Sequence, residues 1–327
     1  MKNLKKIRNF ALIAMMAFFA ISCNDDDNNT VAQDETVVDI AVANPDFSIL
    51  VQALTKADLV TVLRGNGPFT VFAPTNQAFI NAGYTSAIIA GLPNNAIPAL
   101  KEILLNHVVA GNNVSTSLST GYVKTFATGG ASNNTLSMFI NTTNGVVING
   151  GAANGGATVT TADIDADNGV IHVVDAIIGL PTIVNHAIAN PSFGILVQAL
   201  TRADQPDFAG ILSGTQSSPF TVFAPTDAAF VALLGELDLN GLADVPQAVL
   251  ENTLKYHVVA GANVLASTLM NNQVVNTFQG QSFTVQTPTT GARILDARGR
   301  TSSIIATDVQ ASNGVIHAID KVLLPAS

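Results

Sequence analysis

The pattern of apolar residues along the chain predicts the same amphipathic helix twice. Within 47–54, which reads FSILVQAL, apolar side chains recur at i, i+3, i+4 and i+7, the spacing that places them on one buried helix face. The segment 193–200 repeats this pattern as FGILVQAL. Asn44 and Pro45 precede the first copy; asparagine suits a helix cap, and the missing N–H of proline costs no hydrogen bond there. We therefore expect the helix to start at this pair.

A strand with a defined end is predicted by the stretch PFTVFAPT, which occurs at 68–75 and again at 219–226. Apolar residues occupy both faces of this alternating segment, which is typical of an inner strand that is covered on both sides. Pro74 has no N–H to donate to a neighbouring strand, so the strand should end there. Thr75 and Thr226 are suited to cap short helices that follow, because a threonine hydroxyl accepts from a free N–H of the first turn.

The remainder of each half predicts one more helix and then a series of short strands. The helices are expected at about 95–106 and 246–255, and each leads into an HVVAG strand. Asn168-Gly169 and Asn313-Gly314 are hairpin turn signals. The clearest later segments, interpreted as successive antiparallel strands, are SMFIN at 137–141, VVIN at 146–149, SFTVQ at 282–286 and SIIATDV at 303–309. Helices first and strands later is the order of an α+β domain.

The two halves of the chain are copies of one another. Residues 43–58 and 189–204 agree at 13 of 16 positions, and HVVAG and NGVIH also occur in both halves. The length differences between the copies fall in polar Gly/Ser/Pro stretches, where loops tolerate insertions. A repeat of roughly 150 residues is long enough to bury a core of its own. We therefore predict one domain at 36–180 and a second at 181–327.

An export signal precedes the first domain. Four cations stand ahead of the apolar run 10–21, which is short for a membrane span, so residues 1–22 are predicted to be a signal peptide. Cys23, the only cysteine, closes this segment as in a bacterial lipobox, although Ala20 stands where leucine is usual. An ordinary signal peptide with an incidental thiol is the alternative. Residues 23–35 are polar and acidic, which predicts a disordered tether.

This layout predicts a lipid-anchored protein of the cell envelope. An acidic run behind the lipidated cysteine resembles the surface-export signal of some Gram-negative lipoproteins, so we expect an outer-membrane lipoprotein exposed at the surface, joined to the membrane at Cys23. A solvated linker would have the same composition. Loss of the four signal-peptide cations takes the formal net charge from −9 to −13. Such a chain is repelled by nucleic acid, which we exclude as a partner.

The sequence resembles the fasciclin (FAS1) domain family at two signatures, both of which occur in each half. The first is FTVFAPTNQAF at 69–79 and FTVFAPTDAAF at 220–230; the second is NGVIHVVD at 168–175 and NGVIHAID at 313–320. The resemblance implies that each domain is a seven-stranded β wedge or sandwich with helices packed around it. It also implies a non-enzymatic role in cell adhesion or matrix contact, with a partner that is an extracellular or cell-surface protein or polysaccharide.

A Tyr-His pair lies between the two signatures in this family. It is present in the second half, whereas the first half has Asn before His. In animal relatives this region has been linked to integrin binding. The resemblance therefore implies a ligand or adhesion surface formed by Tyr256, His257, Val258, Val259, Asn106 and His107.

Catalysis by histidine is the main alternative. His172 and His317 are each followed three residues later by an aspartate, a pairing that could serve a hydrolase or a carbohydrate-processing enzyme. Residues three apart on a strand point to opposite faces, so we favour core histidines bonded to the backbone. A purely structural envelope spacer is a further alternative, because it requires no ligand.

A calcium loop is the second chemical alternative. Asp163, Asp165 and Asp167 resemble the start of an EF-hand loop, but Asn168 and Val174 stand where glycine and a bidentate glutamate are needed. We favour a polar turn. No Cys/His metal spacing and no phosphate-binding loop occur in the sequence, and no cofactor or metal is expected.

Overall fold

The computed structural model of the chain describes residues 35–214, 216–289 and 291–326. The predicted signal peptide, the lipidation site at Cys23 and the tether up to residue 34 lie outside the described residues. The predicted first domain lies wholly within them, and the predicted second domain does so except for residues 215, 290 and 327. Each contains helices and a sheet.

The first domain begins with helices, as predicted, but α1, α3 and α5 were not indicated by the apolar pattern. Thr36 and Asp39 form a reciprocal capping box at the start of α1. Asn44 accepts from the N–H of Asp46 at 2.9 Å, so the predicted Asn-Pro start is confirmed, although its first turn is a 3₁₀ helix. The helical elements are α1 (Val37–Ala43), η1 (Pro45–Phe47), α2 (Ser48–Lys56), α3 (Val60–Leu63), α4 (Asn76–Asn81), α5 (Ser86–Ala90), η2 (Asn94–Ala96), α6 (Ile97–Leu105) and η3 (Ala152–Asn154).

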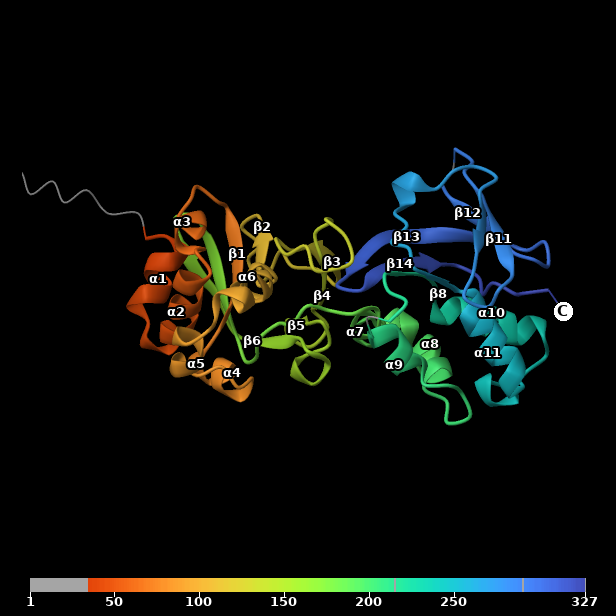
Figure 1. Cartoon of the computed structure of the whole chain (residues 1–327), viewed down its shortest axis with the longest axis horizontal. Coiled ribbons are helices and arrows are strands. Elements are labelled where there is room, and N and C mark those ends of the chain that lie inside the picture. Colours follow the sequence, from red (N-terminus) through yellow and green to blue (C-terminus); the bar gives the residue numbers. More distant parts are fainter. Residues whose placement is uncertain (1–34, 215, 290, 327) are drawn as a thin grey trace, which may run out of the picture. The chain divides into compact units, whose positions relative to one another are not determined.

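A seven-stranded sheet forms the rest of the first domain, in the order β2-β1-β7-β6-β5-β4-β3 (Figure 1). β1 lies between β2 and β7, which confirms the inner strand. The later strands β3 to β7 pair antiparallel in succession, which confirms the expectation of successive antiparallel strands. The β1–β7 pair, which the expectation did not cover, is parallel. The strands are β1 (Phe69–Pro74), β2 (Val108–Ala110), β3 (Gly121–Lys124), β4 (Ser137–Asn141), β5 (Val147–Ile148), β6 (Ala157–Ala166) and β7 (Gly169–Val174).

The second domain repeats this sheet in the order β10-β11-β12-β13-β14-β8-β9, again with one parallel pair, β14–β8. Thr226 accepts from the N–H of Ala229, as the capping prediction requires. The helices are α7 (Ile183–Ala189), η4 (Pro191–Phe193), α8 (Gly194–Leu200), α9 (Phe208–Ser213), α10 (Asp227–Glu236), η5 (Leu242–Asp244), α11 (Gln247–Tyr256) and η6 (Ala266–Thr268). The strands are β8 (Phe220–Pro225), β9 (Val258–Ala260), β10 (Val274–Asn276), β11 (Ser282–Gln286), β12 (Arg293–Leu295), β13 (Thr301–Ala311) and β14 (Gly314–Ile319).

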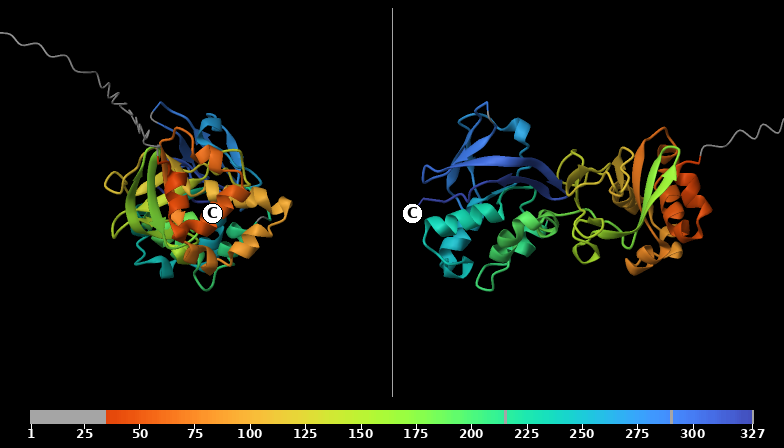
Figure 2. Two further views of the ribbon diagram at one scale, coloured as in Figure 1. Left: turned by 90° about the vertical axis from the view of Figure 1, so that its left-hand side faces the viewer. Right: turned by 180° about the vertical axis from the view of Figure 1, so that it is seen from behind.

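The central strands of each sheet, β1 and β7 or β8 and β14, are buried on both faces. Val71 and Ala73 of β1 join the cluster that contains the side chains of α1, α2 and α6, whereas Phe72 joins a second cluster made of strand residues. Alternate residues of one strand therefore serve two separate cores. Figure 2 shows the first domain from behind, with the red helices α1 and α2 beside its strands. The second domain divides its core in the same way, with Val222 in one cluster and Phe223 in the other.

The asparagine of each hairpin turn also joins the last strand to the first helix. The side chain of Asn168 accepts from the N–H of Val37 at 2.9 Å and donates to the carbonyl of Leu63 at 2.8 Å. Asn313 bonds Ile183 and Leu212 in the same way, at 3.0 and 2.7 Å. These bonds cross more than one hundred residues, so the turn closes each domain as well as the hairpin.

Among the described residues, no single helix has the length and apolar composition that a membrane crossing requires; the bent pair Val37–Ala43 and Pro45–Lys56 meets both criteria only when taken together.

Candidate interaction surface

Tyr256 ends α11 at the point where the chain turns into β9, and its side chain is fully buried. Its hydroxyl donates to the carbonyl of Ser282 at 2.8 Å and accepts from the N–H of Ala297 at 3.1 Å. Burial raises the pKa of the phenol. The tyrosine therefore connects the helix to β11 and to the loop after β12, and it presents no group to solvent.

His257 and His107 occupy equivalent interior positions after Tyr256 and Asn106. The Nε2 of His257 accepts from the N–H of Leu323 at 2.9 Å, which leaves Nδ1 as the donor to the carbonyl of Thr253 at 2.7 Å. His107 accepts from Ile178 and donates to Ile103 in the same arrangement. Burial lowers the pKa of both histidines from 6.5 to about 4. Each ring is neutral at physiological pH and has one fixed tautomer.

The other three residues of the predicted surface are also buried. Val258 and Val259 of β9 are 5% and 7% exposed, and Asn106 is 0% exposed. Asn106 donates to the carbonyl of Gly179 at 2.8 Å, while its Oδ1 has no hydrogen-bond partner among the described residues. The six residues thus form two equivalent interior sites. Their role in adhesion stays a prediction, and a partner would meet the side chains around them.

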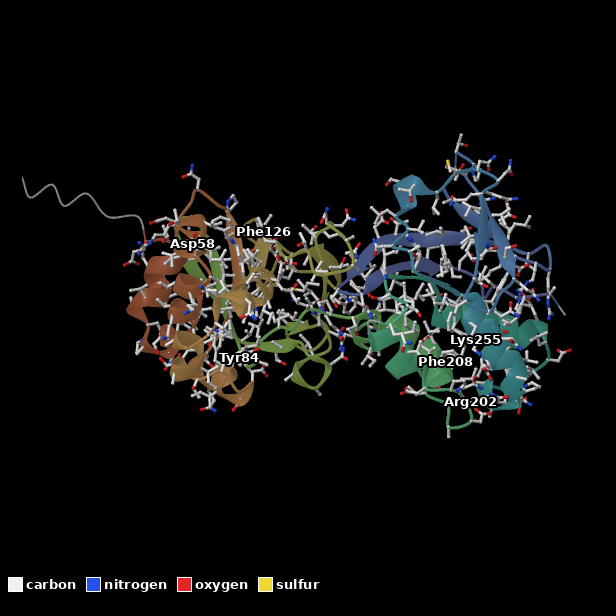
Figure 3. The ribbon with its side chains drawn as sticks, viewed as in Figure 1. Asp58, Tyr84, Phe126, Arg202, Phe208 and Lys255 are labelled. Carbon is white, nitrogen blue, oxygen red and sulfur yellow. The ribbon has the colours of Figure 1, made fainter. Side chains whose placement is uncertain are left out.

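Two phenylalanine side chains beside β2 and β9 are exposed at the surface. Phe126 and Phe278 are each 41% exposed. The N–H of Phe126 donates to the carbonyl of Val108 at 3.0 Å, and that of Phe278 donates to the carbonyl of Val258 at 2.7 Å. Phe126 therefore lies beside β2, and Phe278 lies beside β9. Figure 3 labels Phe126 at the position of β2. Neither phenylalanine was predicted to reach the surface, although the Thr-Phe pair occurs in both halves, at 125–126 and at 277–278.

A groove lies beside Phe278 in the second domain. Its volume is about 670 Å³, which falls within the range of small-molecule binding sites. The carbonyl of Ser217 accepts from the N–H of Gly261 at 3.0 Å, so the groove adjoins the end of β9. The lining combines an aromatic ring and an aliphatic chain with polar side chains: Asp207, Gly210, Ile211, Gly214, Gln216, Ser217 and Phe278.

The histidines of the second signature are core residues. His172 is 0% exposed, its Nδ1 accepts from the N–H of Asp163 at 3.2 Å, and its Nε2 donates to the carbonyl of Asn113 at 2.9 Å. Asp163 has a φ of 63°, in a stretch of β6 where the register shifts, and this irregularity directs its N–H at the ring. His317 has the same arrangement with Asp308 and Val264. Burial lowers the pKa of His317.

The aspartates that follow these histidines bond elsewhere. Asp175 accepts from the N–H of Thr158 at 2.7 Å, and Asp320 accepts from that of Ser303 at 2.7 Å. The prediction that the His-Asp pairs do not meet is therefore confirmed. The carboxylate of Asp163 accepts from both the N–H and the hydroxyl of Ser115, so it serves the neighbouring loop. Across the described ranges, no group of three His, Cys, Asp or Glu residues is placed to hold a metal ion.

Comparison with known protein families matches the fasciclin domain model twice, at residues 45–181 and 191–325. The chain belongs to the fasciclin domain family. The seven-stranded mixed sheet with helices is present in each matched region.

Bacterial and animal proteins are similar to this fasciclin protein. Protein sll1483 of Synechocystis sp. is 40% identical over 145 residues, which cover 44% of this chain and 72% of that protein. Human periostin is 29% identical over 280 residues, which cover 81% of this chain but only 29% of periostin. The solved structure of a FAS1 domain pair from the insect cell adhesion molecule fasciclin I covers 88% of this chain and 95% of that chain, with a TM-score of 0.49 and 19% identity.

Proposed function

We propose that this fasciclin protein is a non-catalytic binding protein of the cell envelope, and that it contacts an extracellular or cell-surface polysaccharide through the groove beside Phe278. The groove is the observation that carries the proposal, because it combines a suitable volume with an exposed aromatic ring and several polar side chains. It also adjoins β9, the segment to which the family resemblance assigns adhesion.

The lining of the groove suits a neutral sugar polymer. One face of a hexose ring is apolar and packs on an aromatic side chain, while its hydroxyls bond carboxylate, amide and hydroxyl groups. Phe278 supplies the ring, and Asp207, Gln216 and Ser217 supply the polar groups. The formal net charge of −13 that remains without the predicted signal peptide disfavours anionic polymers. These features favour an uncharged polysaccharide over an acidic one.

A non-catalytic role is supported by the family and by the bonding of the histidines. Fasciclin domains are typically adhesion domains without enzymatic activity. The ring nitrogens of His107, His172, His257 and His317 all bond the backbone, so none of these four has a free nitrogen for a substrate. A histidine-dependent hydrolase would need at least one such nitrogen at the surface.

Attachment to the outer membrane through Cys23 belongs to the same proposal and rests on the export and lipobox pattern. Metabolic labelling with a fatty-acid analogue should label the wild-type chain and not Cys23→Ala. Protease treatment of intact cells should then remove the folded domains. An unlabelled wild-type chain would contradict the anchor, and protection of a labelled chain would place it on the inner side of the membrane.

The binding proposal is tested with the full chain on a glycan array and on isolated envelope polysaccharide. We expect Phe278→Ala to reduce binding at least tenfold. Phe126→Ala is the matched control, since it removes the same equally exposed side chain from the first domain. Equal binding by wild type and Phe278→Ala would refute the groove as the site. Binding to an extracellular protein alone would replace the polysaccharide with a protein partner, and binding to neither would favour a structural spacer.

A further inference from the structure

The second domain also contains an apolar cavity, whose lining differs from that of the groove beside Phe278. The cavity lies between the helices α7, α8 and α9 and the strand β8, and its volume is about 60 Å³. Its wall is almost entirely hydrocarbon, with Ile183, Leu196, Leu212 and Val222 among the buried residues that line it. Half-buried residues, including Ala209, stand at its opening.

Two polar side chains line this cavity, and both are already bonded. The hydroxyl of Thr201 donates to the carbonyl of Val197 at 2.8 Å. His257 uses Nδ1 and Nε2 for Thr253 and Leu323. A charged or hydrogen-bonding group placed inside would therefore lose its hydration without gaining a partner, which is costly. The chemistry admits only an apolar occupant.

The first domain has a different side chain at the equivalent position of this helical layer. Asn168 bonds the carbonyl of Leu63 and Asn313 bonds that of Leu212, so these two leucines are equivalent. Three residues earlier, Val60 of the first domain corresponds to Ala209 of the second. The second domain thus has a smaller side chain at the helix that closes the layer.

The connection before this helix also differs. In the first domain it comprises residues 57–59, and Leu59 is buried and donates its N–H to the carbonyl of Leu54. In the second domain it comprises residues 201–207. The exposure of equivalent side chains follows this difference: Leu54 is 5% exposed, whereas its counterpart Leu200 is only half-buried. Phe208 takes the place of Leu59 and is also buried, so the differences that border the cavity are the smaller side chain of Ala209 and the half-buried Leu200.

The volume of the cavity distinguishes an unbranched alkyl ligand from a cyclic one. An apolar cavity of about 150 Å³ accommodates benzene, and about 60 Å³ is too small for a six-membered ring. The end of an unbranched chain fits. Arg202 lies next to Thr201, but its guanidinium already bonds Asp204 and the carbonyls of Leu242 and Val245, so it does not favour an anionic head group.

We propose that the cavity between α7, α8 and α9 binds an unbranched alkyl chain whose head group is uncharged. The end of the chain packs among Ile183, Leu196 and Leu212, and the head stays in solvent near Thr201. This site is separate from the groove beside Phe278, and it does not depend on the proposed polysaccharide binding.

A series of 1-alkanols tests the proposal on the full chain labelled with ¹³C at Ile, Leu and Val methyls. We expect 1-butanol, 1-pentanol and 1-hexanol to shift the methyl signals of Ile183 and Leu212 in a saturable manner. Affinity should rise about fourfold per methylene, the value expected for burial of one CH₂, until the cavity is filled. Hexanoate and cyclohexanol should bind at least tenfold more weakly than 1-hexanol.

Ala209→Val reproduces the residue of the first domain and should weaken 1-hexanol binding at least tenfold. Ala203→Val is the matched control, because it makes the same change at an exposed position outside the cavity. Circular dichroism establishes that both variants are folded. No saturable shift at Ile183 and Leu212, or unchanged affinity in folded Ala209→Val, would overturn the proposal. Wild-type affinity in Phe278→Ala is expected, and its loss there would also contradict a separate site.

Discussion

The two domains have nearly the same residues at the start of their helical layer, yet they close it differently. In the first domain a short connection brings Leu59 and Val60 against α1 and α2. In the second domain a longer connection leads to α9, where Ala209 leaves an apolar cavity. The register of the central parallel pair repeats residue for residue. The comparison teaches that the shared residues specify the core, while short insertions and single side chains change the spaces beside it.

The largest effect is expected where a glycine lets two neighbouring strands approach closely in each sheet. A Cβ added at Gly169 would lie 2.0 Å from the carbonyl oxygen of Phe69, and one at Gly314 would lie 2.1 Å from that of Phe220. Gly169→Ala and Gly314→Ala should each destabilise their own domain by about 4 kcal/mol or more, since the contacted atoms are backbone. Differential scanning calorimetry measures the loss.

Gly235→Ala is the control for these substitutions, because a Cβ there meets nothing within 4 Å and the residue lies within α10. Alanine at this position should stabilise the helix by up to about 1 kcal/mol. Wild-type stability of either Gly169→Ala or Gly314→Ala would contradict the shared constraint on β1 and β8.

The next effect concerns the asparagines that close each domain. Asn168→Ala should lower the free energy of unfolding of the first domain by about 3 kcal/mol. The N–H of Val37 and the carbonyls of Leu63 and Gly65 would lose their hydrogen-bond partner. Asn313→Ala should cost a similar amount in the second domain. Chemical denaturation gives both values. A loss confined to one domain would show that the repeated bonds are not equally important.

The buried histidines make both domains sensitive to acid in the same pH window. Burial lowers the pKa of His107 and His257 from 6.5 to about 4, so above pH 6.5 both states are neutral and stability is complete. Between pH 6.5 and 4 the unfolded chain takes up protons that the folded chain does not, and stability falls. Each of these two histidines should lower the free energy of unfolding by about 3 kcal/mol as the pH falls from 6.5 to 4.

Denaturation at a series of pH values measures this effect, with His107→Gln and His257→Gln as variants that do not titrate. Each variant should flatten the pH dependence of the domain that carries it. Stability that rises as the pH falls from 6.5 to 4 would have the wrong sign and would contradict neutral buried rings.

The smallest effect tests the difference between the helical layers directly. Ala209→Val should stabilise the second domain by about 1 kcal/mol in the absence of ligand, because it buries two more methyl groups in an existing space. Val60→Ala should destabilise the first domain by a similar amount. Thermal unfolding provides the measurement, and a destabilised but folded Ala209→Val would indicate that the cavity is narrower than the structure shows.

Much of the fold was predictable because it depends on short-range signals. Pro74 ends a strand and Thr75 caps the next helix whatever surrounds them, so β1 and α4 were located correctly. The parallel pairing of β1 with β7 was missed, because β-strand periodicity does not reveal which strands become neighbours. The helix α1 was also missed. The N–H of its first residue, Val37, donates to the side chain of Asn168, which is far away in the sequence.

The candidate site was less predictable. The Tyr-His region was located through a family resemblance, but its side chains point inward and bond the backbone. Phe278 and the groove beside it were not predicted. A phenylalanine in a sequence is expected to be buried, and only the packing of α9 and the following loop beside β9 leaves this one exposed.

By itself the sequence determined that there are two copies of one α+β domain, where their repeated strands and caps lie, and that a positively charged apolar segment precedes them. These properties depend on residue type and spacing along the chain. The tertiary structure alone decided which repeated residues reach solvent and where space remains between the helices. It also decided which ring nitrogen carries the proton in His107, His172, His257 and His317. Those properties depend on atoms that are distant in sequence and are brought together only when both faces of each sheet are covered.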